Sequence, residues 1–202
     1  TGADGSWKET VVGIKNAVKS DIYVSTNTTL SKQNAADFLT TIDYLKELDV
    51  DAFGCNSLIY SGKAPSASDE FALTTDELKA LLPKVRDKAQ LLALRFLWYT
   101  PTQYCSFNPV QLGLGIKSCT AAMINACVGP NGDVYPCQSY FESMGNILSE
   151  PWQQIWNSPL AAKLRKREYI ETKCHDCPDL QACGGGCPLE LQNKERTCKP
   201  TA

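Results

Sequence analysis

The sequence lacks an excess of charge of either sign, a long apolar run and, in its first half, cysteine. Lys and Arg number 20 against 22 Asp and Glu, so no positive field gathers the phosphates of a nucleic acid. The longest apolar run, 91–99, is interrupted by Arg95 and is far shorter than the ~20 residues that cross a bilayer. We therefore expect neither a nucleic acid nor a membrane as a partner. No export signal is recognisable, which predicts a cytoplasmic protein.

Cysteine is scarce before residue 100 and abundant after it. Of the 10 cysteines, only Cys55 lies in the first 100 residues. A metal centre clusters its ligands in this way. Disulfides explain the pattern poorly, because several spacings are too short for a bridge and no secretion signal exists. Cys55 itself lies in an apolar stretch, and we expect it to be a small buried core residue.

Residues 7–99 show a helical pattern followed by a strand pattern, repeated along the chain. The predicted helices begin near Trp7, near Phe38 and at Thr74 or Thr75, whose hydroxyl can cap the last one. Pro83 should kink or end that helix. The predicted strands lie within 21–30, 52–60 and 91–99. This alternation predicts an α/β fold with a parallel sheet and outer helices, either doubly wound or part of a βα barrel.

Two further segments bear on the organisation of the chain. Residues 61–71 form a predicted loop at the C-terminal end of a strand, where such folds place ligands; an exposed polar connection is an equally good interpretation. After Tyr99 the sequence becomes rich in Pro and Gly and loses periodicity. We place a domain boundary near Pro101, with domains at 1–100 and 101–202.

The last cysteines have the spacing C-x2-C-x5-C-x3-C-x10-C. Cysteines two residues apart can hold one metal site from a tight turn, and the three glycines 184–186 remove the Cβ atoms that would block the backbone. Five thiolates are one too many for a single site. In bacterial ferredoxins, the last Cys of such a run, followed by Pro, binds the other cluster of a pair, and Cys187 precedes Pro188. We assign Cys187 to a first cluster and the remaining four to a second cluster: Cys174, Cys177, Cys183 and Cys198.

The first cluster needs partners from the preceding cysteines, among them Cys119 and Cys137. Asn131-Gly132 predicts a hairpin with a two-residue turn and positive φ at both residues. In that register Cys127 lies opposite Pro136, so Cys127 and Cys137 project from opposite faces and should not share a cluster; a bulge would reverse this. The fourth ligand of the first cluster is then Cys105, Cys127 or a non-protein group.

Other features have simpler explanations. His175 is the only histidine, and we expect a solvent-facing turn residue rather than a ligand. Trp152, Ile155 and Trp156 form a predicted core stripe, and Ser158 is a predicted helix cap. A zinc-binding structural or interaction module also uses paired cysteines, but the additional cysteines favour iron and sulfide. An independent ferredoxin-like electron carrier is a further alternative, against which the helix-strand units of the first half argue.

These residues together resemble the SPASM domain, the twin-cluster extension at the C-terminus of many radical S-adenosylmethionine (radical SAM) enzymes. The family signature is a Cys, a gap, G-x4-C, C-x2-C-x5-C-x3-C and a final Cys. Its positions are filled by Cys119, Gly132, Cys137, Cys174, Cys177, Cys183, Cys187 and Cys198. The helix-strand units just upstream look like the last half of the radical SAM partial barrel. The linking segment 144–159 is also similar to that of the family.

The resemblance implies two auxiliary 4Fe-4S clusters that support radical modification of a peptide, a protein or a small cofactor precursor. The intact enzyme, an oxidoreductase or maturase, would also hold S-adenosylmethionine and a third 4Fe-4S cluster, with a reductase such as ferredoxin or flavodoxin as partner. That third cluster is bound by CxxxCxxC, which this sequence does not contain. We therefore expect a C-terminal part of a longer enzyme, inactive by itself. Sulfatase-maturing members carry Asp directly after the Cys matching Cys137, and Gln138 stands here, which argues against that activity.

Overall fold

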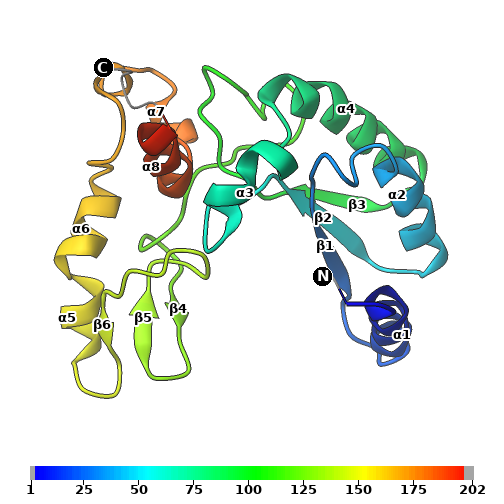
Figure 1. Ribbon diagram of the computed structural model, residues 1–202, viewed down its shortest axis with the longest axis horizontal. Helices are drawn as coiled ribbons and strands as arrows, with labels where there is room; N and C mark the ends of the chain where they lie inside the picture. Colours follow the sequence, from blue (N-terminus) through cyan, green and yellow to red (C-terminus); the bar gives the residue numbers. More distant parts are fainter. Residues whose placement is uncertain (1–2, 198–202) are drawn as a thin grey trace. The chain divides into compact units, whose positions relative to one another are not determined.

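The computed structural model describes residues 3–197, which form two compact units (Figure 1). The parallel-sheet unit comprises the residues up to Leu58 together with Glu70–Tyr99 and Val110–Gly115. The cysteine-rich unit comprises Ile59–Asp69, Thr100–Pro109 and the residues from Ile116 onward. The chain thus passes between the units more than once, and the domains at 1–100 and 101–202 stay a prediction. None of the helices in the described part of the chain combines the length and apolar character needed to cross a bilayer.

The parallel-sheet unit is built on strands β1 (Ser25–Thr29), β2 (Ala52–Asn56) and β3 (Arg95–Trp98), in the order β1-β2-β3. Both pairings are parallel, which confirms the predicted α/β fold. Every residue of β2 is buried, as expected for a central strand of a parallel sheet. The strands are shorter than predicted, because 57–60 and 91–94 lie outside them.

Helices α1 (Ser6–Val18), α2 (Phe38–Glu47) and α4 (Thr75–Leu91) precede the strands as predicted. The Thr74 side chain caps α4 in a reciprocal capping box with Glu77. The expectation that Pro83 could end this helix is wrong, because α4 continues to Leu91. The fixed φ of proline is compatible with a helix. Buried residues lie both before and after Pro83, Leu82 and Val85 among them, so packing stabilises the helix on both sides of the proline.

The core of this unit lies between the sheet and two helices. In Figure 1, α2 and α4 lie side by side next to the sheet, and their inward residues Phe38, Ile42 and Leu82 are almost fully buried. Helix α1, in contrast, has no buried residue, and Trp7 is 62% exposed. Its apolar spacing therefore forms no core within the described residues.

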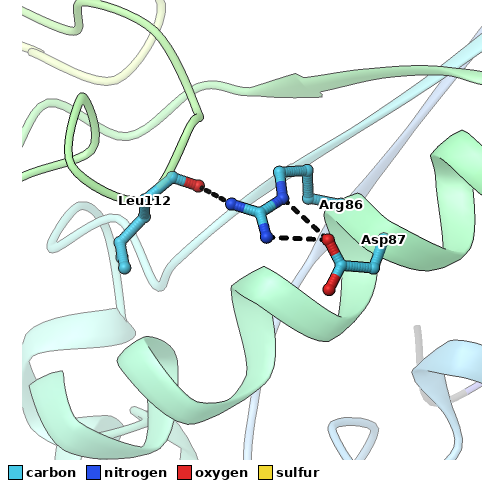
Figure 2. A network of polar contacts seen from close by, with 3 residues as sticks. All are labelled: Arg86, Asp87 and Leu112. Carbon is cyan, nitrogen blue, oxygen red and sulfur yellow. Dashed lines mark hydrogen bonds and ion pairs between the residues drawn. The ribbon is translucent and has the colours of Figure 1, made fainter.

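Arg86 attaches the segment Val110–Gly115 to the rest of this unit. Arg86 of α4 donates from Nη1 to the carbonyl oxygen of Leu112 at 2.6 Å, and its Nε and Nη2 donate to Asp87 at 2.9 and 2.7 Å (Figure 2). Gly113, with φ 69°, follows directly, and a Cβ there would approach Arg86 to 3.0 Å. The glycine thus permits the close approach of the loop to the helix.

The predicted loop 61–71 is partly helical, which corrects the sequence interpretation. Helix α3 covers Ala64–Phe71, and Pro65 lies in its first turn, where no amide hydrogen is needed. Before the helix, Ser61 donates from Oγ to the carbonyl oxygen of Ser139 at 2.5 Å. That bond attaches the start of the segment to the cysteine-rich unit.

The cysteine-rich unit contains a small antiparallel sheet of β4 (Cys127–Val128), β5 (Asp133–Tyr135) and β6 (Gly145–Asn146). The predicted hairpin is present, but the prediction that it has a two-residue turn is wrong. Gly132 donates to the carbonyl oxygen of Gly129 at 3.0 Å, and of Asn131 and Gly132 only the glycine has positive φ, 89°. Pro130 suits the second position of such a turn, which adds a glycine bulge and shifts the register.

The remaining elements are short: α5 (Trp152–Trp156), α6 (Pro159–Arg165), η1 (Thr172–Cys174), α7 (Leu180–Cys183) and α8 (Pro188–Thr197). Ser158 caps α6, as predicted, by accepting from the amide of Ala161. The hairpin, α5 and α6 share a hydrophobic core. Val134, Ile155 and Leu164 belong to it, and Cys137 packs against it. Of the predicted core stripe, Ile155 is buried, but Trp152 is 46% exposed and stacks on Trp156.

Candidate functional site

Cys119, Cys137 and Cys187 come together in the cysteine-rich unit from three distant segments. Burial raises the pKa of the Cys119 thiol, and the nearby Cys137 raises it further. Burial and then the charge of Cys119 raise the pKa of Cys187 to about 12. Cys119 is thus the electrostatic neighbour of both Cys137 and Cys187. These three residues, here called the first thiol group, need a nearby positive charge to be held as thiolates.

Backbone amides also point to these sulfurs. The amide of Ala121 opposes the pKa rise at Cys119 through a hydrogen bond. At Cys187 the amides of Glu190 and Leu189 do the same, because Cys187 directly precedes α8 and the N–H groups of the first helical turn lie beside it. Amides that donate to sulfur stabilise the ligands of an iron-sulfur cluster and tune its potential.

A second thiol group lies on the other cysteine-rich segment. Cys174 ends η1, and the amide of Cys177 donates to its carbonyl oxygen at 3.2 Å, which closes the expected tight turn. Burial raises the pKa of Cys174, and Glu171, Cys105 and Cys183 raise it further in that order. The buried Cys183 ends α7. The structure thus gathers Cys105, Cys174 and Cys183, with Cys177 one turn away.

The glycine turn between the groups is shaped as its sequence suggests. Gly184, Gly185 and Gly186 have φ of 67°, 82° and 87°, a region that favours glycine. A Cβ at Gly185 would lie 2.3 Å from Cγ2 of Ile170, and one at Gly186 would lie 3.3 Å from the backbone nitrogen of Gln103. A side chain at Gly185 would collide with Ile170, and the positive φ disfavours a side chain at all three positions. The glycines therefore permit the turn between Cys183 and Cys187.

Sequence reasoning missed two side chains that lie among the thiols. Tyr169 donates from its hydroxyl to the carbonyl oxygen of Gly184 at 3.3 Å; burial, and then the charge of Cys119, raises its pKa. Arg167 donates to the carbonyl oxygen of Leu180 at 2.8 Å, and its positive charge lowers the pKa of Cys119 against the burial that raises it. Both come from an irregular segment whose sequence carries no motif, so only the fold could reveal them.

The hairpin register changes the argument about Cys127. Cys127 lies opposite Tyr135 and not opposite Pro136, so the prediction that Cys127 and Cys137 project from opposite faces loses its basis. Strand β5 ends at Tyr135, so the alternation of faces along the strand does not assign a face to Cys137. Cys127 therefore stays a candidate ligand; its sulfur lies 4.0 Å from the carbonyl oxygen of Val128.

Four further residues were singled out in the sequence. Cys55 is fully buried in β2, and burial raises the pKa of its thiol well above the ordinary value, so the expected core role is confirmed. His175 is exposed, as expected for a turn residue. Cys105, which the sequence offered to the first cluster, lies near Cys174. Cys198 lies outside the described residues.

The donor set fits iron-sulfur clusters better than single ions. Among the side chains that the structure describes, which exclude those from residue 194 onward, no three His, Cys, Asp or Glu side chains form a group that could hold one metal ion. A zinc ion needs its sulfur ligands about 2.3 Å from one point, whereas a four-iron cluster spreads its thiolates over a larger body. Two separate groups of soft thiol donors, with backbone amides beside them, suit the latter.

Comparisons with known proteins agree with this chemistry. Residues 119–178 match the SPASM family, described as an iron-sulfur cluster-binding domain. The chain is 26% identical over 196 residues to an AdoMet-dependent heme synthase of Methanosarcina barkeri, covering 91% of this chain and 56% of the relative. It is 32% identical over 78 residues to the mycofactocin maturase MftC of Mycobacterium ulcerans, covering 36% of this chain and 21% of the relative. The chain spans about half the length of the heme synthases that it matches.

Solved structures share the fold. Streptococcus suis SuiB bound to the precursor peptide SuiA superposes with a TM-score of 0.68 at 18% identity, covering 92% of this chain and 45% of SuiB. Native anSMEcpe with bound AdoMet gives a TM-score of 0.63 at 16% identity, covering 94% of this chain and 57% of that protein. The likeness extends over both units, since it covers more than nine tenths of the chain.

Proposed function

Because the chain belongs to the radical SAM/SPASM proteins, we propose that its cysteine-rich unit binds two auxiliary 4Fe-4S clusters. Cys119, Cys137 and Cys187 hold the first cluster. Cys174, Cys177 and Cys183 hold the second cluster, to which the sequence pattern also assigns Cys198. The clusters serve a radical modification of a peptide, a protein or a small cofactor precursor.

The observation that carries the proposal is the division of the thiols between two places. Cys183 and Cys187 are only four residues apart, yet Sγ of Cys183 accepts from the amide of Tyr104 at 3.3 Å, whereas Cys187 precedes α8 and has Cys119 as its electrostatic neighbour; Tyr169 is near both. The three-glycine turn is what separates them. A single metal site would bring the two sulfurs to one point, so the division supports a pair of clusters.

When bound, such clusters supply one-electron transfer, and here they would take up or relay the electron that remains when a substrate radical is oxidised. The chain's own residues prepare the sites. Arg167 places a positive charge near Cys119 and ties itself to α7, which offsets the accumulated negative charge. Tyr169 fixes the glycine turn through Gly184. The core around Val134 holds the strand that ends before Cys137.

The relatives support more than one class of substrate. The heme synthase match runs along 91% of this chain, and the maturase match covers 36%. The chain also shares its fold with SuiB, whose structure contains the precursor peptide SuiA. This supports a peptide substrate equally well. We therefore propose these substrate classes together and expect the reaction to need S-adenosylmethionine, a CxxxCxxC segment and a reductase.

The test is the iron, acid-labile sulfide and zinc content of this chain after anaerobic reconstitution. Two four-iron clusters give about eight irons and eight sulfides per chain, and Cys137→Ala and Cys177→Ala should each remove about half. Cys55→Ala is the matched control, since Cys55 lies in the other unit and should leave the iron content unchanged. Stoichiometric zinc without sulfide would replace the proposal with a structural metal module.

The enzymatic part of the proposal has its own test. The gene that encodes this chain should contain a CxxxCxxC motif upstream in the same reading frame, and the protein made from it should cleave S-adenosylmethionine under reducing conditions. A reading frame without that motif would leave a cluster-binding protein of another kind, such as an electron carrier.

A further inference from the structure

Helix α6 ends in a turn that favours glycine, and an arginine stands there instead. The amide of Arg167 donates to the carbonyl oxygen of Leu164 at 3.0 Å, and the amide of Glu168 donates to that of Lys163 at 3.1 Å, which is the Schellman pattern of a helix end. Arg167 follows the cap residue Lys166 and has φ 57°, a left-handed conformation that is strained for any residue with a Cβ. Strain of this kind indicates a role for the side chain.

The side chain of Arg167 reaches the glycine turn that follows Cys183. Its Nη1 donates to the carbonyl oxygen of Leu180 in α7 at 2.8 Å. A Cβ on Gly184 would lie 3.6 Å from Nη2 of Arg167 and 3.0 Å from Cβ of Ser118. Ser118 directly precedes Cys119 in the sequence. The guanidinium and the segment that carries Cys119 therefore meet at the same glycine.

The charge of Arg167 acts on the first thiol group. Burial raises the pKa of the Cys119 thiol, and the positive charge of Arg167 opposes that rise. Arg167 is half-buried, and water and salt screen a charge less there than at the surface. No carboxylate among the described side chains forms an ion pair with Arg167, so none of them neutralises its charge. A guanidinium also keeps its charge at any pH that a folded protein tolerates.

We propose that Arg167 raises the reduction potential of the first cluster by stabilising its reduced form. This rests on the proposed function. Reduction adds one electron to a cluster that already carries the negative charge of its thiolates, breaks no bond and moves no proton at Arg167. In the proposed reaction the electron comes from the substrate radical, which is thereby oxidised. The net charge around a cluster is one of the factors that set its potential, and a positive charge beside it favours the reduced state.

The experiment is a redox titration of the reconstituted 202-residue chain with dithionite as the reductant, followed by EPR. We expect Arg167→Gln to disfavour reduction of the first cluster on the order of tenfold, which for one electron lowers the potential by about 59 mV. Arg167→Lys keeps the charge and should restore most of the wild-type potential. Lys166→Gln is the matched control, because it removes the same charge from the exposed neighbouring residue and should leave the potential unchanged.

The two clusters are distinguished by combining Arg167→Gln with the loss of one cluster. With Cys177→Ala, which should keep the first cluster, the potential should fall as in the single variant. With Cys137→Ala, which should keep the second cluster, it should change far less. An unchanged potential in Arg167→Gln at full iron content would overturn the proposal. An equal fall in Arg167→Gln and Arg167→Lys would also overturn it, since lost packing and not lost charge would then be the cause.

The iron content separates the charge of Arg167 from a purely structural role. Loss of iron from Arg167→Gln with full iron in Arg167→Lys would support the proposal, because only the charge distinguishes a variant that holds the cluster from one that does not. Loss of iron from both variants would overturn it. If the wild-type chain itself takes up no iron and sulfide, the proposed function fails, which is a different result from full iron content with an unshifted potential.

Discussion

The glycine turn that separates the two thiol groups gives the sharpest test of the fold, through the substitution Gly185→Ala. Gly185 has φ 82°, and a left-handed conformation costs an L residue about 1–2 kcal/mol. The added Cβ would also lie 2.3 Å from Cγ2 of Ile170, and forcing an extra methyl into packed surroundings costs about 1–3 kcal/mol. The free energy of unfolding of the metal-free chain should therefore fall by about 2–5 kcal/mol.

The control isolates the steric contribution. Gly62 also has positive φ, 59°, but a Cβ there meets no atom within 4 Å, so Gly62→Ala should cost only the conformational part, about 1–2 kcal/mol. Urea unfolding followed by circular dichroism measures both. Adding Ile170→Ala to Gly185→Ala removes Cγ2 and should recover part of the loss. Equal destabilisation by Gly185→Ala and Gly62→Ala would refute the close packing of the turn against Ile170.

Three further predictions concern the cap of α4 and the reactivity of two cysteine thiols. Thr74→Ala removes the capping box of α4 and should lower the free energy of unfolding by about 1 kcal/mol, measured by urea unfolding with Thr75→Ala as control. Hydrogen bonds from Thr74 hold the pKa of Glu77 below its ordinary value of 4.5, so the stability that the carboxylate adds is present above pH 4.5 and is lost as the pH falls through the lowered pKa. Glu77→Gln should flatten the pH dependence of unfolding below pH 4.5, and an unchanged slope would contradict this. In the metal-free chain, iodoacetamide should modify the exposed Cys105 and spare Cys55, whose burial raises its pKa; peptide mapping that finds both modified at one rate would show that β2 is not buried.

Much of the architecture followed from local patterns. Helical periodicity and β-branched runs predicted α1, α2, α4 and the parallel strands, because each element expresses its own buried face in its own residues. The cysteine spacing likewise predicted a site in the second half, since a tight turn with paired thiols needs no distant partner to be recognised. The capping residues Thr74 and Ser158 were identified for the same reason, as each bonds to an amide three residues away.

The sequence by itself determined the α/β fold, the cysteine clusters and the need for glycine between Cys183 and Cys187, because those properties depend on neighbours in the chain. The tertiary structure alone decided which thiols face one another. The bulge at Gly132 shifts the hairpin register by one residue, and a one-residue shift exchanges the faces of a strand. The contact between Tyr104 and Cys183 spans 79 residues, and no periodicity or motif encodes it, since long-range packing of irregular segments depends on the whole fold.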